Sequence, residues 1–193
     1  MSRITPGERT RFLFRNLLQG FLWLAVILFL FWLFRYKIDL PFSEWLEPIL
    51  GKPFLVFLIY TLSEFFFGII PPELFMLWAL NPGDTGYYIR IVSLLSVISY
   101  LAGITGYGVG YRLGQSVWFR FLRRRFFGKL QGYLNRFGVF VILVAALTPL
   151  PFSGASMLIG SGHYPLKRYA LWALSRFLRF LIYGFIVWKA AII

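Results

Sequence analysis

Two carboxylates inside a long apolar stretch constrain the fold of this chain more than any other feature. Glu64 and Glu73 lie within the run from Phe54 to Leu80, which Pro71 and Pro72 interrupt near its middle. An ionised side chain at the centre of a bilayer costs roughly 3 kcal/mol or more, so residues of this kind are usually functional. The pattern predicts a membrane protein that uses both acids, and a transporter is the class we expect.

Composition and charge favour the same class. Apolar residues make up 59% of the chain and charged residues 14%, which is too apolar for the single core of a soluble domain. The net charge is +13, but the basic residues flank apolar segments, so we expect an anionic lipid surface as partner and no nucleic acid. Cysteine is absent and His163 stands alone, so we expect no metal site and no cofactor.

About three full spans are expected in an all-α integral membrane protein. The first covers residues 16–37, whose apolar run is long enough to cross most of a core about 30 Å thick. Several arginines precede it, which favours a cytoplasmic N-terminus in a bacterial inner (plasma) membrane. The others are Tyr87 to Tyr107 and Tyr169 to Trp188. Between them, the basic stretch 108–138 has apolar residues at helical spacing, which indicates an amphipathic helix on the membrane surface or an ordinary cytoplasmic loop.

Two apolar runs, Phe54–Leu80 and Val139–Ile159, are broken by prolines at corresponding places: Pro71, Pro72, Pro149 and Pro151. We expect each run to form a re-entrant hairpin, with a kinked span as the alternative for the first run. A single crossing separates the two runs, so the hairpins enter from opposite sides. This predicts one membrane domain built as an inverted repeat, with halves at 39–107 and 108–190.

The candidate site residues are the two acids and three arginines. A buried carboxyl group can load and release a proton if water reaches it alternately from each side, so Glu64 and Glu73 are predicted proton carriers. The alternative is a structural role, either capping broken helix ends or pairing with arginine. Arg112, Arg176 and Arg179 are candidates for binding an anionic substrate, although the last two would snorkel to the interface under a second interpretation.

Small and hydroxylated residues in the second half suggest structural roles. We expect Thr148, Ser153 and Ser156 to satisfy backbone groups freed at the second break, with direct ligand contact as the alternative. The glycines between 103 and 110 are expected to permit close helix packing and not to form a phosphate loop.

The order of these motifs resembles the DedA family of membrane proteins, also called the VTT family. The similarity rests on Glu64 with Pro72-Glu73, on the glycine-rich stretch 106–114, and on Phe137-Gly138, Pro149 and Gly160, and it covers roughly Lys52 to Tyr183. The resemblance implies a re-entrant-loop fold and movement of lipids, either proton-coupled recycling of a polyprenyl phosphate or phospholipid scrambling. The family usually has arginines three residues before and after the second proline, where this chain has Ala146 and Phe152.

The sequence therefore predicts a transporter of an anionic phospholipid or a polyprenyl phosphate, with protons as the coupling ion. Catalytic residues are not expected, because the acids that a serine hydrolase would need are placed on the opposite side from His163. A non-transporting assembly or scaffold protein and a lipid-modifying enzyme remain alternatives, and a homo-oligomer stays open.

Overall fold

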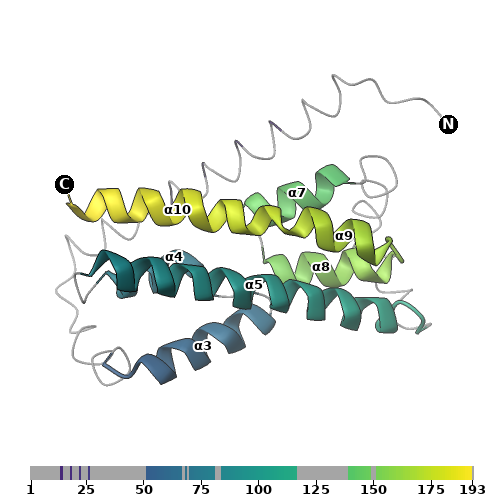
Figure 1. Ribbon diagram of the computed structural model, residues 1–193. Helices are drawn as coiled ribbons and strands as arrows, with labels where there is room; N and C mark the ends of the chain where they lie inside the picture. Colours follow the sequence, from purple (N-terminus) through teal and green to yellow (C-terminus); the bar gives the residue numbers. More distant parts are fainter. Residues whose placement is uncertain are drawn as a thin grey trace.

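The computed structural model describes residues 51–66, 68, 70–80, 84–116, 139–148 and 151–192, with isolated positions at 14, 18, 22 and 26. Apart from those four positions, the expected N-terminal span and the segment up to residue 50 lie outside the described residues. So does most of the basic stretch 108–138, from residue 117 on, whereas its first residues continue the preceding helix as far as Leu113. Every regular element of the described chain is a helix, which confirms the all-α prediction (Figure 1).

The first half of the described chain forms three helices: α3 (Pro53–Phe65), α4 (Pro72–Ala79) and α5 (Thr85–Leu113). Helices α3 and α4 both begin with proline, whose fixed φ suits the first helical position and whose missing N–H has no helical partner there. Asp84 caps α5, because its carboxylate accepts hydrogen bonds from the backbone N–H groups two and three residues later at 2.9 and 3.0 Å.

The second half forms α7 (Val139–Leu147), α8 (Phe152–Ser161), α9 (Leu166–Ala173) and α10 (Ser175–Ile192). Both apolar runs are thus interrupted at the predicted prolines. Only Leu174 separates α9 from α10, and its backbone N–H bonds three residues back to the carbonyl of Leu171 at 3.3 Å. This tight turn lets α9 and α10 continue in one direction (Figure 1).

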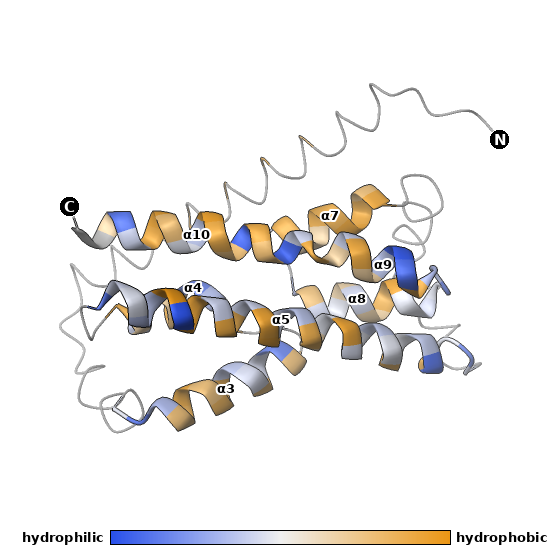
Figure 2. Cartoon of the chain, viewed as in Figure 1, coloured by the Kyte–Doolittle hydropathy of each residue, from blue (hydrophilic) through white to orange (hydrophobic). Residues whose placement is uncertain are grey.

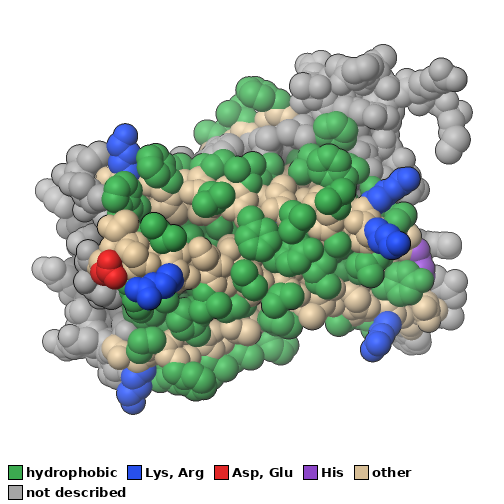
Figure 3. Space-filling view, viewed as in Figure 1, with side chains coloured by type: hydrophobic (Ala, Val, Ile, Leu, Met, Phe, Trp, Pro, Cys, Tyr) green, Lys and Arg blue, Asp and Glu red, His purple; other side chains and the backbone are tan. Residues whose placement is uncertain are grey.

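Two described helices are long and apolar enough to cross a membrane, Thr85–Leu113 and Leu166–Ala190. They contain the spans expected at 87–107 and 169–188. Figure 3 shows hydrophobic side chains across the middle of the visible face, with basic side chains gathered toward the two ends. That distribution suits a protein whose middle contacts lipid tails and whose ends reach water.

Helices α3 and α4 occupy one end of the molecule and α7 and α8 the other, while α5 and α10 run along both (Figure 1). The buried apolar residues form one cluster at each end. The first gathers around Tyr60, Met76 and Leu95, and the second around Ile142 and Phe152. The breaks in the two apolar runs therefore fall between two separate cores.

The most extensive helix contact joins α5 to α8 through small residues. The close approaches are Gly103 to Phe152, Gly106 to Ser153 and Gly110 to Met157. A Cβ atom at residue 106 would lie 2.6 Å from the carbonyl oxygen of Ser153, whereas one at Gly108 would meet nothing within 4 Å. Gly106 and Gly110 thus allow the two backbones to touch, and Gly103 leaves room for the ring of Phe152, so three of the four glycines between 103 and 110 permit the close packing predicted from their spacing.

Candidate functional site

The two helix breaks meet at one place in the fold. Gly68 lies in the first break with φ of +61°, a conformation that glycine adopts without steric cost. A Cβ atom on this residue would lie 3.9 Å from the Cα atom of Pro151, in the second break, and 4.0 Å from both carboxylate oxygens of Glu64. Residues other than glycine rarely adopt a positive φ, so they are unsuited to position 68. Glycine lets the backbone turn here, directly beside the carboxylate of Glu64.

Glu64, at the end of α3, forms a buried group with residues of α5 and α10. The Nη2 atom of Arg176 lies 3.4 Å from each carboxylate oxygen of Glu64. Between them, the Ser99 hydroxyl donates to Glu64 Oε2 at 2.8 Å and accepts from Arg176 Nε at 2.8 Å. Because all three side chains are buried, these contacts act with little screening by water.

Glu73, in the first turn of α4, forms a second pair with α10. Arg179 Nη2 donates to Glu73 Oε1 at 2.7 Å, and Arg179 Nη1 donates to the backbone carbonyl of Thr148 at 2.7 Å. The second contact satisfies a carbonyl at the end of α7, where the helix no longer supplies a partner. A single arginine thus joins the first break to the second.

Aromatic rings enclose both guanidinium groups. Arg176 lies over the ring of Phe152 at 4.5 Å and near that of Phe180 at 5.7 Å, and these two rings belong to different apolar cores. Arg179 lies 5.0 Å from the ring of Tyr183. Figure 2 shows hydrophilic positions within the largely hydrophobic helix α10. The rings exclude water and add a favourable interaction with each cation.

The cluster of two glutamates and two arginines is formally neutral, yet one of its nitrogen atoms and one hydroxyl oxygen of α8 have no hydrogen-bond partner among the described residues. These are Arg176 Nη1 and the hydroxyl oxygen of Ser153 in the first turn of α8. Arg176 is 2% exposed and Ser153 is 3% exposed, so protein atoms and not bulk water surround them. A buried donor without an acceptor costs free energy, which makes these two atoms points where a polar group of a ligand gains most.

The structure brings together four of the five predicted site residues: Glu64, Glu73, Arg176 and Arg179. Both arginines are buried and paired, so they do not snorkel to an interface in this structure. The fifth, Arg112, is exposed in the last turn of α5 and lies outside the cluster. It is 13 residues from Ser99 on one helix, roughly 20 Å along the axis.

The positions where the family usually has arginine contribute differently here. Ala146 is fully buried in the second core, and Phe152 supplies the ring under Arg176. The positive charge at the breaks therefore comes from α10 and not from residues on either side of the second proline.

The hydroxyl groups of the second break bond differently from the sequence-based expectation. Thr148 Oγ1 donates to the carbonyl of Val144 at 2.5 Å, and Ser156 Oγ donates to that of Phe152 at 2.6 Å. Ser153 has no such bond. The first two thus bond to backbone carbonyls, but these lie four residues earlier, and that of Val144 also accepts the N–H of Thr148 at 3.0 Å. They are not groups freed at the break, and the Ser153 hydroxyl bonds to no backbone group among the described residues.

Sequence reasoning missed Ser99 and Tyr60. Tyr60 is fully buried beside the cluster, and its hydroxyl donates to the carbonyl of Leu95 at 2.9 Å. The signal for Ser99 was a small polar side chain at the centre of an apolar span, a position where hydroxyl groups commonly bond to neighbouring helices. Among the described residues, no group of three or more His, Cys, Asp or Glu side chains is placed to hold a metal ion.

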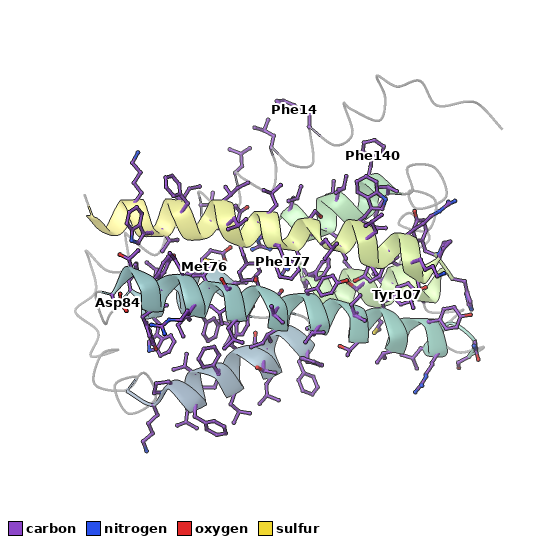
Figure 4. The ribbon with its side chains drawn as sticks, in the orientation of Figure 1. Phe14, Met76, Asp84, Tyr107, Phe140 and Phe177 are labelled. Atoms are coloured by element: carbon purple, nitrogen blue, oxygen red, sulfur yellow. The ribbon has the colours of Figure 1, made fainter. Side chains whose placement is uncertain are left out.

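An apolar cavity of about 270 Å³ lies between α5 and α10. Its lining includes Val92 of α5 and Phe180, Phe185 and Trp188 of α10. Phe180 also contacts Arg176, so the cavity reaches the aromatic shell of the ion-pair cluster. Figure 4 shows Phe177, which follows Arg176 in the sequence, over the middle of the molecule and well away from Asp84 at the start of α5.

Comparison with known proteins gives one result. The family model of the VTT domain matches residues 70–189, which is more than half of the chain. The match begins at the end of the first helix break, after Glu64, and includes the second break and α10 as far as residue 189. No curated protein and no solved structure matches the sequence. In the part of the chain that the structure describes, every regular element is a helix and two helices are long and apolar enough to span a membrane. Because the family model matches more than half of its length, this chain belongs to the VTT domain family, the DedA family of membrane proteins.

Proposed function

We propose that this protein moves an anionic lipid or a lipid-linked phosphate across the bilayer, with protons as the coupling ion. The observation that carries the proposal is the pair of buried Glu–Arg contacts at the meeting point of the two helix breaks. Charged groups inside a membrane are costly, and they recur where broken helices form the substrate site of a transporter.

The unpartnered donors support an anionic substrate. Arg176 Nη1 lacks an acceptor, and the Ser153 hydroxyl lies in the first turn of α8, where backbone N–H groups also lack helical partners. A phosphoryl oxygen accepts hydrogen bonds from all three kinds of donor, and arginine suits it by geometry as well as charge. An anion entering here satisfies groups that the protein alone leaves unsatisfied.

The apolar cavity supports a lipid over a small inorganic anion. Phe180 lines this cavity and also contacts the guanidinium of Arg176. A molecule with a phosphate near Arg176 and a hydrocarbon chain along α5 and α10 fits both environments. Burial of the chain adds favourable free energy in proportion to the apolar area removed from water.

Proton coupling follows from the charge balance of the cluster. Its two arginines and two glutamates sum to zero, so an anionic head group adds an uncompensated negative charge in a medium of low dielectric constant. Protonation of Glu64 or Glu73 removes one negative charge and leaves one arginine without its ionised partner. A singly charged anion that binds to this arginine then makes the cluster neutral again. Proton and anion are then carried together.

The same proposal includes the membrane arrangement. Helices α3 and α4 form a re-entrant hairpin from one side and α7 and α8 one from the other, with an N-terminal span making three crossings in a plasma membrane with the N-terminus in the cytoplasm. The breaks then meet near mid-membrane, where alternating access to a fixed site requires them.

The test is lipid movement in reconstituted liposomes. Labelled phosphatidylglycerol, a polyprenyl phosphate and a neutral diacylglycerol are supplied with and without a pH gradient, and appearance in the opposite leaflet is measured. We expect movement of the phosphate-bearing lipids, loss with Arg176→Gln, and partial recovery with Arg176→Lys, because lysine keeps the charge without the planar fork. Arg90→Gln, which removes an exposed arginine of α5, is the matched control and leaves the rate unchanged.

Three results would overturn the proposal. Full activity of a double Arg176→Gln, Arg179→Gln variant on phosphate-bearing lipids would remove the arginines from the transport site. Chemical turnover of a lipid without a gradient would indicate an enzyme. The absence of both transport and turnover would indicate a scaffold.

A further inference from the structure

Ser99 occupies a particular place in the fold. It is the central residue of α5, with 14 helical residues on each side, and it is fully buried. Its hydroxyl lies between the carboxylate of Glu64 and the guanidinium of Arg176, at 2.8 Å from each. Since α5 is a candidate membrane span, Ser99 connects the acid of α3 and the arginine of α10 to the midpoint of that span.

The donors and acceptors of this contact have one arrangement when Glu64 is ionised. Arg176 Nε carries a hydrogen and cannot accept, so it donates to the Ser99 oxygen. A serine hydroxyl has a single hydrogen, and it therefore points to Glu64 Oε2. That oxygen accepts the bond as a carboxylate, since a proton on Oε2 would meet the serine hydrogen directly.

A neighbouring contact keeps the serine in this orientation. In a helix a serine hydroxyl commonly donates to the carbonyl four residues earlier, which here is that of Leu95. The Tyr60 hydroxyl already donates to this carbonyl at 2.9 Å, in addition to the helical N–H of residue 99. The usual alternative acceptor for Ser99 is therefore occupied, and Glu64 is left as its acceptor.

We propose that Ser99 is a positioning residue that holds Glu64 in its ionised, arginine-paired state. Uptake of a proton at Glu64 Oε2 then requires the hydroxyl to turn away, so Ser99 sets the pH at which the acid releases Arg176. The effect of Ser99 on transport rests on the proposed function. The effect of Ser99 on the protonation of Glu64 rests only on the contacts described above.

Other groups near Glu64 set the background against which Ser99 acts. Among the described residues, the charged ones are Arg176 and Arg179 from α10 and Glu73 from α4. The ionisable hydroxyls that interact with Arg176 belong to Tyr60 of α3, Tyr169 of α9 and Tyr183 of α10. Helices α7 and α8 carry no titratable side chain. A change at Ser99 leaves all of these residues in place, so a shift in the titration reports the lost hydroxyl.

The test is a pH titration of Glu64 by infrared spectroscopy of the reconstituted protein. The band of its protonated carboxyl group is identified as the one missing in Glu64→Gln. In Ser99→Ala the carboxylate loses a hydrogen bond to its charged form, so the midpoint of this titration is expected to move to higher pH by about one to two units. Ser99→Thr retains the hydroxyl and is expected to titrate as the wild type does.

Ser96→Ala is the matched control on the same helix. Ser96 is also buried, but its hydroxyl donates to the backbone carbonyl of Ser93 at 2.6 Å and does not contact the cluster. Ser99→Cys keeps the side-chain volume with a weaker donor and gives a shift in the same direction if Ser99→Ala does not fold. An unchanged midpoint in the alanine and cysteine variants, or an equal shift in Ser96→Ala, would overturn the inference.

The pH profile of lipid movement separates this inference from the proposed function. If the protein transports lipid, the profile of Ser99→Ala moves to higher pH together with the infrared midpoint, and Ser99→Thr restores it. If the wild type moves no lipid while the infrared shift is present, the proposed function fails and the role of Ser99 at Glu64 stands.

Discussion

The buried pair of Glu73 and Arg179 predicts two single variants whose stability depends differently on pH. The two side chains are 6% and 3% exposed and meet at 2.7 Å, so removing either partner leaves the other without compensation. Breaking a buried pair typically destabilises a protein by roughly 3–5 kcal/mol. We expect losses of this size for Glu73→Leu and for Arg179→Leu at neutral pH.

The pH dependence follows from which group can become neutral. After Arg179→Leu, the isolated Glu73 takes up a proton in the folded state more readily than in the unfolded state, so the variant loses stability as pH rises. After Glu73→Leu, the guanidinium of Arg179 stays charged at any accessible pH, so the stability that this variant loses changes little with pH. Removing both, in Glu73→Leu/Arg179→Leu, leaves only the Thr148 carbonyl unsatisfied, at about 1–3 kcal/mol.

The assay is reversible unfolding by sodium dodecyl sulfate in mixed micelles, followed by circular dichroism at acidic, neutral and alkaline pH. The control is Arg90→Leu, whose pair with Asp84 is 3.8 Å long and largely exposed, and which should cost less than about 1 kcal/mol. If both single variants lose no more than this control, or if their losses simply add in the double variant, the pair does not contribute as the contacts indicate.

Two further predictions concern the helix packing and the membrane arrangement. Gly110→Leu should destabilise the fold by about 1–3 kcal/mol or more, because its Cβ would meet the backbone of Met157, whereas Gly108→Leu points into open space and should be nearly neutral in the same unfolding assay. Equal effects would contradict the α5–α8 contact. Single cysteines at Lys52 and Thr85, which flank α3 and α4, should react with an impermeant thiol reagent from the outside, and one at Ser116 only from the cytoplasm. Labelling of the first two from opposite sides would mean that this segment crosses the membrane.

The helix breaks and the two acids were predictable because each depends on local chemistry. Proline cannot continue a helix interior, so Pro71, Pro72 and Pro151 mark boundaries wherever they occur in an apolar run. A carboxylate within such a run is conspicuous against its neighbours. The structure ends α3 before the first break and starts α4 and α8 at or beside the prolines, as this reasoning predicts.

The pairing of charges was not predictable, because it depends on how distant segments pack. Glu64 and Arg176 are separated by 112 residues, and the spacing of Arg176 and Arg179 fitted a snorkelling pair equally well. Ser99 gave a weaker signal still, since a serine in a span often bonds to its own helix. Its role appears only when α3, α5 and α10 are seen together. The glycines of α5 were an intermediate case, because their number predicted close packing but not which helix they face.

The proton dependence of lipid movement tests the central claim most directly. In the liposome assay, Glu64→Gln and Glu73→Gln keep the size and hydrogen-bonding capacity of a protonated glutamate but cannot release a proton. We predict that each variant adopts the wild-type fold at lower stability, moves phosphate-bearing lipid at a strongly reduced rate and loses the response to a pH gradient. Wild-type rates with unchanged pH dependence in both variants would contradict the account.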